Sequence, residues 1–268
     1  MRDDNPVASA QGPDDDEDAK EHCILYPAEA LALLACPMVP LSRRRGYALA
    51  IYIGARSNEL AAIAARDVDE VHARISITKQ VDRASGEDVK TKTRKERTFD
   101  LEPALVPLLR VLADERKTGR LLELPPLNYR APLLRKDVAT ALQWARIDLR
   151  ADLLLEEGTG DRLVLRFHDL RHTCLTWMAV RGDDPMRIQW RGGHTDFATT
   201  QGYIAAGKNL AANFGAPFPR YRLACSMRFR LRFRLLAEPT MADLAQNKGR
   251  QEYRRRGSNP YSLAGTGF

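Results

Sequence analysis

Six side chains between residues 56 and 203 form a set suited to attack on a phosphodiester. They are two arginines, a lysine, two histidines and a tyrosine: Arg56, Lys92, His168, Arg171, His194 and Tyr203. The five cationic or hydrogen-bond-donating groups can hold phosphate oxygens and the charge that develops at phosphorus. The phenol can act as a covalent nucleophile, which divides one difficult transfer into two easier steps. The set therefore predicts phosphoryl transfer that needs no metal ion.

Four short segments carry these residues, and each segment alone is a weak signal. In chain order they are I-Y-I-G-A-R-S-N-E-L, K-T-R-K-E-R-T-F-D-L, F-H-D-L-R-H-T and R-G-G-H, the last followed nine residues on by tyrosine. Together, this order and spacing resemble the tyrosine recombinase (phage integrase) family over roughly residues 26–207. The resemblance implies an α+β catalytic domain that is mainly helical, with a small antiparallel sheet.

The resemblance also implies which side chains would hold the scissile phosphate. Arg56 looks like the first catalytic arginine of the family, with Glu59 three residues on. His168 and Arg171 match the family's histidine and second arginine, and on a helix residues three apart share one face. Arginine suits this task because its planar fork binds two phosphate oxygens and keeps its charge. By resemblance, His194 donates a further hydrogen bond to the phosphate.

The chemical step implied by the resemblance is attack by Tyr203 on DNA. It leaves a 3′-phosphotyrosyl link and a free 5′-hydroxyl, with Lys92 as general acid on the leaving oxygen. Lys90 and Lys95 compete with Lys92 for that role, because five basic residues crowd into positions 90–97. The covalent link retains the energy of the broken bond, so resealing needs neither ATP nor magnesium, and we expect no cofactor.

Two features of the sequence depart from the family pattern. Gly192 stands where the family usually has leucine before Gly-His, and Asp100 stands where it usually has proline. In addition, the segment before the expected catalytic domain is too short for the N-terminal clamp domain of full-length members. Three functions stay open: a site-specific recombinase or integrase, a relaxing enzyme with type IB topoisomerase-like chemistry, and a non-catalytic DNA-binding remnant.

Periodicity and caps predict the elements that would position these residues. A helix is expected from Ser42 to a stop at Gly54, and Arg56 should lie at the start of the next helix. Alternation from Arg74 to Leu101 predicts a small antiparallel sheet. Residues 124–132 are expected to be a proline-rich loop. The remaining helices are expected over 27–36, 57–65, 102–116, 133–147, 169–181, 183–191 and 197–206.

Charge is distributed unevenly along the chain and predicts three regions. Residues 1–22 hold eight acidic and two basic side chains and are expected to be a disordered leader. Residues 23–207 would be the catalytic domain, and 208–268 a poorly ordered basic extension. The overall net charge of +7 fits a polyanion, and the resemblance makes it double-stranded DNA. It also implies a tetramer on DNA, with residues 209–218 packing on a neighbouring protomer.

Cysteine spacing and hydropathy indicate in which cellular compartment the protein is expected. The four cysteines show no C-x-x-C spacing, so a zinc site or disulfide framework is not indicated. No stretch reaches the ~18 apolar residues of a membrane span. We expect a cytoplasmic, nucleoid-associated protein of a mobile element. A general RNA binder is disfavoured because aromatic platforms for base stacking are missing.

Overall fold

The structure is a computed structural model of the chain. It describes residues 23–82, 84–91, 96–125, 127–150, 153, 164–210 and 214–222. The expected acidic leader, Lys92, and the part of the basic extension after residue 222 lie outside the described residues.

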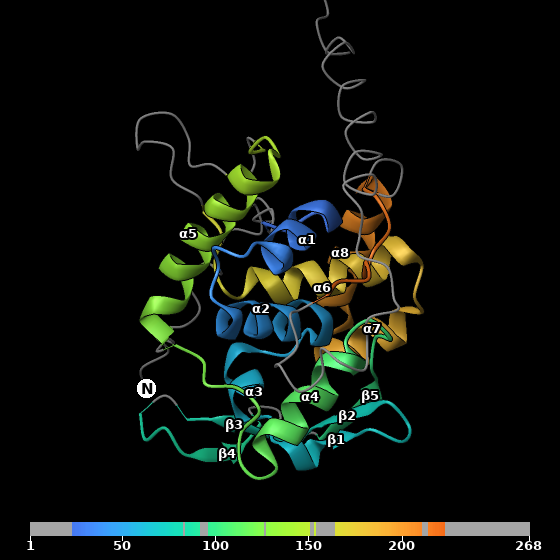
Figure 1. Cartoon of the computed structure of the whole chain (residues 1–268). Helices are drawn as coiled ribbons and strands as arrows, with labels where there is room; N and C mark the ends of the chain where they lie inside the picture. The colour runs from blue at the N-terminus through green and yellow to red at the C-terminus, as the bar shows by residue number, and fades with distance from the viewer. Residues whose placement is uncertain are drawn as a thin grey trace, which may run out of the picture.

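The described residues form mostly helices, with short strands at one end of the molecule (Figure 1). The helices are α1 (Pro27–Ala35), α2 (Leu41–Ile53), α3 (Ser57–Ala62), the 3₁₀ turn η1 (Ala65–Asp67), α4 (Val106–Arg116), α5 (Leu127–Ala145), α6 (Asp169–Arg181), α7 (Pro185–Gly192) and α8 (Phe197–Leu210). The strands are β1 (Val68–Asp69), β2 (Arg74–Ile77), β3 (Lys79–Val81), β4 (Asp88–Lys90) and β5 (Arg97–Asp100). This mainly helical architecture with small antiparallel sheets confirms the predicted fold class.

The strands form two small antiparallel sheets. One has the order β1-β2-β5, and the other pairs β3 with β4. In β5, Arg97 and Phe99 are buried while Thr98 and Asp100 are exposed, as expected for alternating side chains. The register places Phe99 opposite Ile75 and Arg97 opposite Ile77. This register turns one arginine of the basic hairpin inward, toward the helices.

Helix α6 lies at the centre of the core, against α2 and α8. Its inward face carries Leu170, Leu175 and Trp177, none of which has measurable exposure to solvent. Full burial of a large apolar side chain contributes about 1.5–3 kcal/mol, so this stripe strongly determines how α6 is placed. The helix ends at Gly182, whose φ of 85° is in the left-handed region that glycine adopts without strain.

Three predicted helix starts were wrong, each because of local bonding. The Pro40 carbonyl accepts the first helical bond of α2, so Pro40 rather than Ser42 is the N-cap. Before α4, a tighter bond from Leu105 N–H to the Glu102 carbonyl delays the regular helix to Val106. Helix α5 begins at Leu127, inside the expected loop. Its first turn is held by Arg130, which donates to the Pro125 carbonyl at 2.7 Å.

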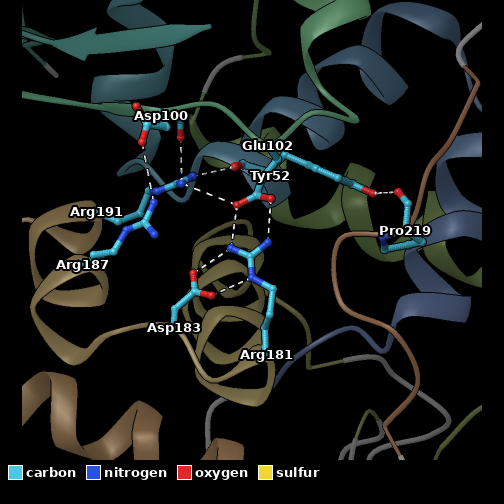
Figure 2. Close-up of polar contacts among 8 residues, drawn as sticks. All are labelled: Tyr52, Asp100, Glu102, Arg181, Asp183, Arg187, Arg191 and Pro219. Atoms are coloured by element: carbon cyan, nitrogen blue, oxygen red, sulfur yellow. Dashed lines mark hydrogen bonds and ion pairs between the residues drawn. The ribbon is translucent and has the colours of Figure 1, made fainter.

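The chain after α8 returns to its own helical body. Phe214 and Phe218 are buried, and the Phe218 ring packs edge-on against Tyr52 of α2 and Trp177 of α6. The Tyr52 hydroxyl also donates to the Pro219 carbonyl (Figure 2). Residues 214–222 are therefore part of the core, beyond the expected domain boundary at residue 207. They pack here on their own chain, whereas residues 209–218 were expected on a neighbouring protomer.

Candidate active site

Arg171 is a buried cation held between two turns of the backbone. Its guanidinium donates to the Gly54 carbonyl at 2.9 Å and to the Gly192 carbonyl, which follow α2 and end α7 respectively. Burial, and then the nearby charge of Arg56, lower the pKa of Arg171 to about 10. The group still carries its charge at neutral pH. The fold thus keeps a positive charge fixed at the point where α2, α6 and α7 meet.

Arg56 lies beside Arg171, at the start of α3, as the sequence predicted. Its backbone N–H and its Nη1 both donate to Glu59, at 2.8 and 3.1 Å, and its Nη2 donates to the Gly193 carbonyl at 3.2 Å. The side chain is 29% exposed, in contrast to that of Glu59, which is fully buried. The buried carboxylate of Glu59 therefore orients Arg56, while part of the arginine side chain remains accessible to a ligand.

Glu59 also binds a third arginine, Arg97 of β5. The two side chains form a bidentate ion pair, with nitrogen–oxygen distances of 3.1 and 2.6 Å, and both are buried. Burial alone would raise the pKa of Glu59, but the hydrogen bonds and charge of Arg97, together with Arg56, lower it to about 2. The ionised carboxylate links the sheet to the arginine pair.

His194 follows α7 and is positioned by α8. Its Nδ1 lies 3.0 Å from Thr200 Oγ1, and its ring is parallel to that of Tyr203, with centroids 5.6 Å apart. Burial, and then the charges of Arg171, Arg56 and Arg97, lower its pKa to about 4. His194 is therefore neutral at physiological pH. With Nδ1 engaged by Thr200, its Nε2 remains as the nitrogen suited to donate to a phosphate.

Tyr203 lies on α8 with only 5% of its surface exposed. Burial raises its pKa to about 12, while the charges of Arg171 and Arg56 act in the opposite direction. Its hydroxyl is 2.5 Å from His172 Nδ1. His172 in turn packs edge-on against His168, which is exposed at the start of α6.

Five of the six predicted site residues fall within the described part of the chain, and the fold gathers them around one hydroxyl. Arg56 and Arg171 act electrostatically on both His194 and Tyr203, and His168 joins through His172. Lys92 lies outside the described residues, so its role stays a prediction. Within the described residues, no three His, Cys, Asp or Glu side chains are grouped so that they could hold a metal ion.

Sequence reasoning missed His172, Arg97 and Thr200. Two of them had a usable signal. His172 lies four residues after His168, on the same face of a predicted helix, and Arg97 shares the strand parity of the apolar Phe99. Thr200 is recognisable only in three dimensions, because nothing in its neighbourhood along the chain pairs it with His194.

Gly192, a departure from the family pattern, has a local explanation. A Cβ atom at this position would lie 2.7 Å from His194 Cε1 and Nε2, closer than real contacts allow. The imidazole therefore occupies space that a leucine would fill. Its position over Tyr203 depends on the absence of a side chain at residue 192.

A network of charged side chains joins the end of α7 to the end of α6 (Figure 2). Arg191 donates to the carbonyls of Tyr52 at 3.1 Å and Asp100 at 3.0 Å, and it lies 3.5 Å from Glu102. The same carboxylate binds Arg181, at the end of α6, through two hydrogen bonds of 2.7 and 2.9 Å. These contacts fix the end of α7, which carries the glycines and His194.

Comparison with known proteins agrees with this geometry. The model of the phage integrase family matches residues 25–209, and this chain belongs to that family. The resemblance to tyrosine recombinases noted from the motifs is confirmed. No curated protein sequence matches the chain significantly.

Solved structures show the same fold at low sequence identity. The Tn1549 transposon integrase (residues 82–397), in complex with transposon right end DNA, matches with a TM-score of 0.56 and 18% identity. That alignment covers 70% of this chain and 63% of the integrase, so this chain spans less than two thirds of its length. The XerA recombinase matches with a TM-score of 0.50, 21% identity, and coverage of 74% and 66% respectively.

Two of the expectations on compartment can be compared with the structure. No helix among the described residues is long and apolar enough to cross a membrane. Cys36 and Cys174 are buried free thiols, and Cys225 lies outside the described residues.

Proposed function

We propose that this chain is a site-specific DNA recombinase or integrase that cleaves and rejoins duplex DNA through Tyr203. The observation that carries the proposal is the position of the Tyr203 hydroxyl, buried within the fields of Arg56 and Arg171 and covered by His194. A phosphate placed on the two guanidinium groups would have its negative charge compensated there. The family membership and the DNA-bound Tn1549 integrase support DNA as the substrate.

The residues divide the reaction between them. Arg56, Arg171 and the neutral His194 hold the non-bridging oxygens, with His168 at the open edge. The Tyr203 oxygen forms a bond to phosphorus, the bond to the 5′ oxygen breaks, and Lys92 supplies the proton to that leaving oxygen. The 3′-phosphotyrosyl link conserves the bond energy, so rejoining by the 5′-hydroxyl requires no ATP. By family resemblance, the cleaving unit on DNA is a tetramer.

Covalent capture on nicked duplexes tests this proposal. A pool of suicide duplexes with a random central segment is incubated with the protein in EDTA, and SDS-resistant complexes are isolated and their DNA is sequenced. We expect a protein–DNA adduct of one preferred sequence class that is absent with Tyr203→Phe. DNA binding that weakens with salt, without an adduct, would instead favour the non-catalytic remnant.

Plasmid relaxation separates recombination from simple relaxing activity. A type IB topoisomerase-like enzyme would relax supercoiled plasmid without a preferred sequence, whereas a recombinase would act on the captured sequence and exchange strands between two copies of it. Arg171→Ala is the comparison variant for both assays. It removes the buried cation that would bind the phosphate but keeps Tyr203, so we expect it to lose both activities.

A further inference from the structure

His172 contacts the hydroxyl of Tyr203 directly, and the proposed function gives it no role. We propose that His172 is the catalytic base of DNA cleavage, accepting the proton of Tyr203 as the tyrosine attacks phosphorus. This assignment rests on the function proposed above. It adds a residue to the six that the motifs identify.

The geometry suits direct proton transfer. His172 Nδ1 and Tyr203 Oη are 2.5 Å apart, and both residues are buried, at 7% and 5% exposure. The two rings lie within 27° of parallel, with centroids 5.7 Å apart. The backbone of His172 is held in α6 by the hydrogen bond from its amide N–H to the His168 carbonyl. A general base needs hydrogen-bond reach of the proton that it removes, and this contact already provides it.

The hydroxyl needs such an acceptor. Phenol is a weak nucleophile while protonated, and burial moves the Tyr203 pKa further from neutrality despite the nearby arginines. A buried hydroxyl also has little access to bulk water that could remove the proton. A neutral imidazole bonded to the oxygen can take the proton as the new bond forms.

The other two histidines of the site are engaged differently. His194 uses Nδ1 for its contact with Thr200. His168 is exposed and lies against the ring of His172, with centroids 4.8 Å apart in an edge-on arrangement. His168 therefore lies between the buried acceptor and solvent, which suits release of the proton rather than its first capture.

The step is balanced in protons and electrons. A lone pair of Tyr203 Oη forms the bond to phosphorus while the hydroxyl proton moves to His172 Nδ1, giving an imidazolium. The bond from phosphorus to the 5′ oxygen breaks, and its electron pair stays on that oxygen, which takes a proton from the general acid. In resealing, the imidazolium returns its proton to the departing phenolate.

The charges around this pair act in both directions. His172 is faced by Tyr203 from α8 and by His168 from its own helix. Arg171 and Arg56 favour loss of the Tyr203 proton, while the carboxylate of Asp169 opposes it. A bound phosphate would add its negative charge beside the arginines, where the transferred proton would give a cationic imidazole.

The test compares two substitutions of one residue. Asparagine at position 172 keeps an acceptor near the place of Nδ1 but cannot take up a proton, while alanine removes the acceptor altogether. Single-turnover cleavage of the captured duplex is measured from pH 5 to 9, with melting and DNA binding checked for each variant. His72→Asn is the control, because His72 lies exposed on a turn of the small sheet.

We expect His172→Asn to bind DNA normally and to cleave at least about 100-fold more slowly at pH 7. Its rate should rise about tenfold per pH unit, since only spontaneous ionisation then supplies phenolate. The wild-type rate should instead level off above the titration of one imidazole. That limb of the wild-type profile is a measurement that does not depend on any variant folding.

The outcomes separate this proposal from the one on which it rests. Wild-type cleavage that His172→Asn matches at every pH would exclude a proton-accepting role and leave the recombinase assignment intact. Faster cleavage by His172→Ala would show that the contact restrains Tyr203, and it would also overturn the proposal. If the wild-type protein forms no adduct, both assignments fail together.

Discussion

The phenol of Tyr203 is subject to two opposing influences. Burial disfavours its anion, and the guanidinium groups of Arg56 and Arg171 favour it, with a net pKa of about 12. In the reaction proposed here, the phenol would therefore attack only when a bound phosphate joins the proton acceptor His172, which already contacts the hydroxyl. At the scale of single residues, the neighbours that orient the imidazoles and the phenol decide reactivity.

Thr200→Val should slow cleavage without harming the fold. The change removes the oxygen that lies 3.0 Å from His194 Nδ1 and preserves the buried volume. The hydrogen bond that orients His194 contributes about 1–1.5 kcal/mol, and its loss from the transition state corresponds to a roughly tenfold lower rate. Single-turnover cleavage measures the effect. Thr140→Val is the control, since the Thr140 hydroxyl donates to the Lys136 carbonyl of its own helix; equal rates for both variants would contradict the prediction.

His194 should make stability depend on pH between about 4 and 6.5. Its folded pKa of about 4 is below the ordinary 6.5, so the unfolded chain binds a proton first as pH falls. The stability that follows from a neutral His194 is therefore present above pH 6.5 and lost as pH approaches 4. Urea midpoints of the wild type and His194→Gln should converge from pH 7 to pH 4.5. A constant difference between them would show that the pKa is not depressed.

At the scale of elements, α8 must lie close against α6 for Tyr203 to reach the site. Gly207, one turn after Tyr203, makes this approach possible. A Cβ there would lie 2.7 Å from Ala179 Cβ and 3.0 Å from its backbone carbon. The backbone of α6 cannot give way as a flexible side chain would.

Gly207→Leu should move α8 outward and reduce both stability and cleavage. Overpacking of this kind typically costs about 1–3 kcal/mol, and the shift would carry Tyr203 away from the arginines. Gly202→Ala is the matched control on the same helix, because a Cβ there meets nothing within 4 Å. It should stabilise the helix by up to about 1 kcal/mol. Thermal melts and adduct yields decide the comparison, and a tolerated leucine would refute close packing at this point.

The connection between α3 and β5 depends on the buried Glu59–Arg97 pair. Glu59→Gln would leave Arg97 buried without a countercharge and loosen Arg56, so we expect a loss of roughly 3 kcal/mol. Glu123→Gln breaks the exposed pair with Arg116 and should cost less than about 1 kcal/mol. Chemical denaturation measures both free energies of unfolding. Similar small losses would mean that the buried pair contributes no more than a surface one.

At the scale of the whole molecule, the segment after α8 closes the hydrophobic core. Phe218 contacts both Tyr52 and Trp177, and Arg181 lies over its ring with the guanidinium carbon 4.5 Å from the centroid. The segment therefore packs across α2 and α6 and joins them in one core. Its packing on its own chain is a property that the order of motifs does not reveal.

Phe218→Ala should destabilise the whole domain by about 3 kcal/mol, since it opens a cavity among large aromatic rings. The expected readout is a lower melting temperature with a single transition, because the segment is part of the core. Phe197→Ala is the control, at a phenylalanine that is 37% exposed. An unchanged melting temperature for Phe218→Ala would show that the segment is only loosely attached.

Local patterns were sufficient for much of the molecule. Helical spacing and a glycine stop correctly predicted α6 and its end, and alternation predicted antiparallel strands between Arg74 and Leu101. Predictions were weakest where individual hydrogen bonds or tertiary packing, rather than periodicity, decide local structure. The Pro125 carbonyl and Arg130 start α5 inside a segment that looks like a loop, and Phe218 is buried by residues more than forty positions away.

The sequence by itself determined the family, the order of its motifs and most of the helices, because these depend on residue type and short-range spacing. Only the tertiary structure decided which groups meet the Tyr203 hydroxyl. Side chains from α3, α6 and the turn before α8 are brought together by burial of apolar faces, and that long-range packing leaves little trace in local spacing. His172 became a candidate base for that reason: its significance lies in a contact with a helix thirty-one residues further along the chain.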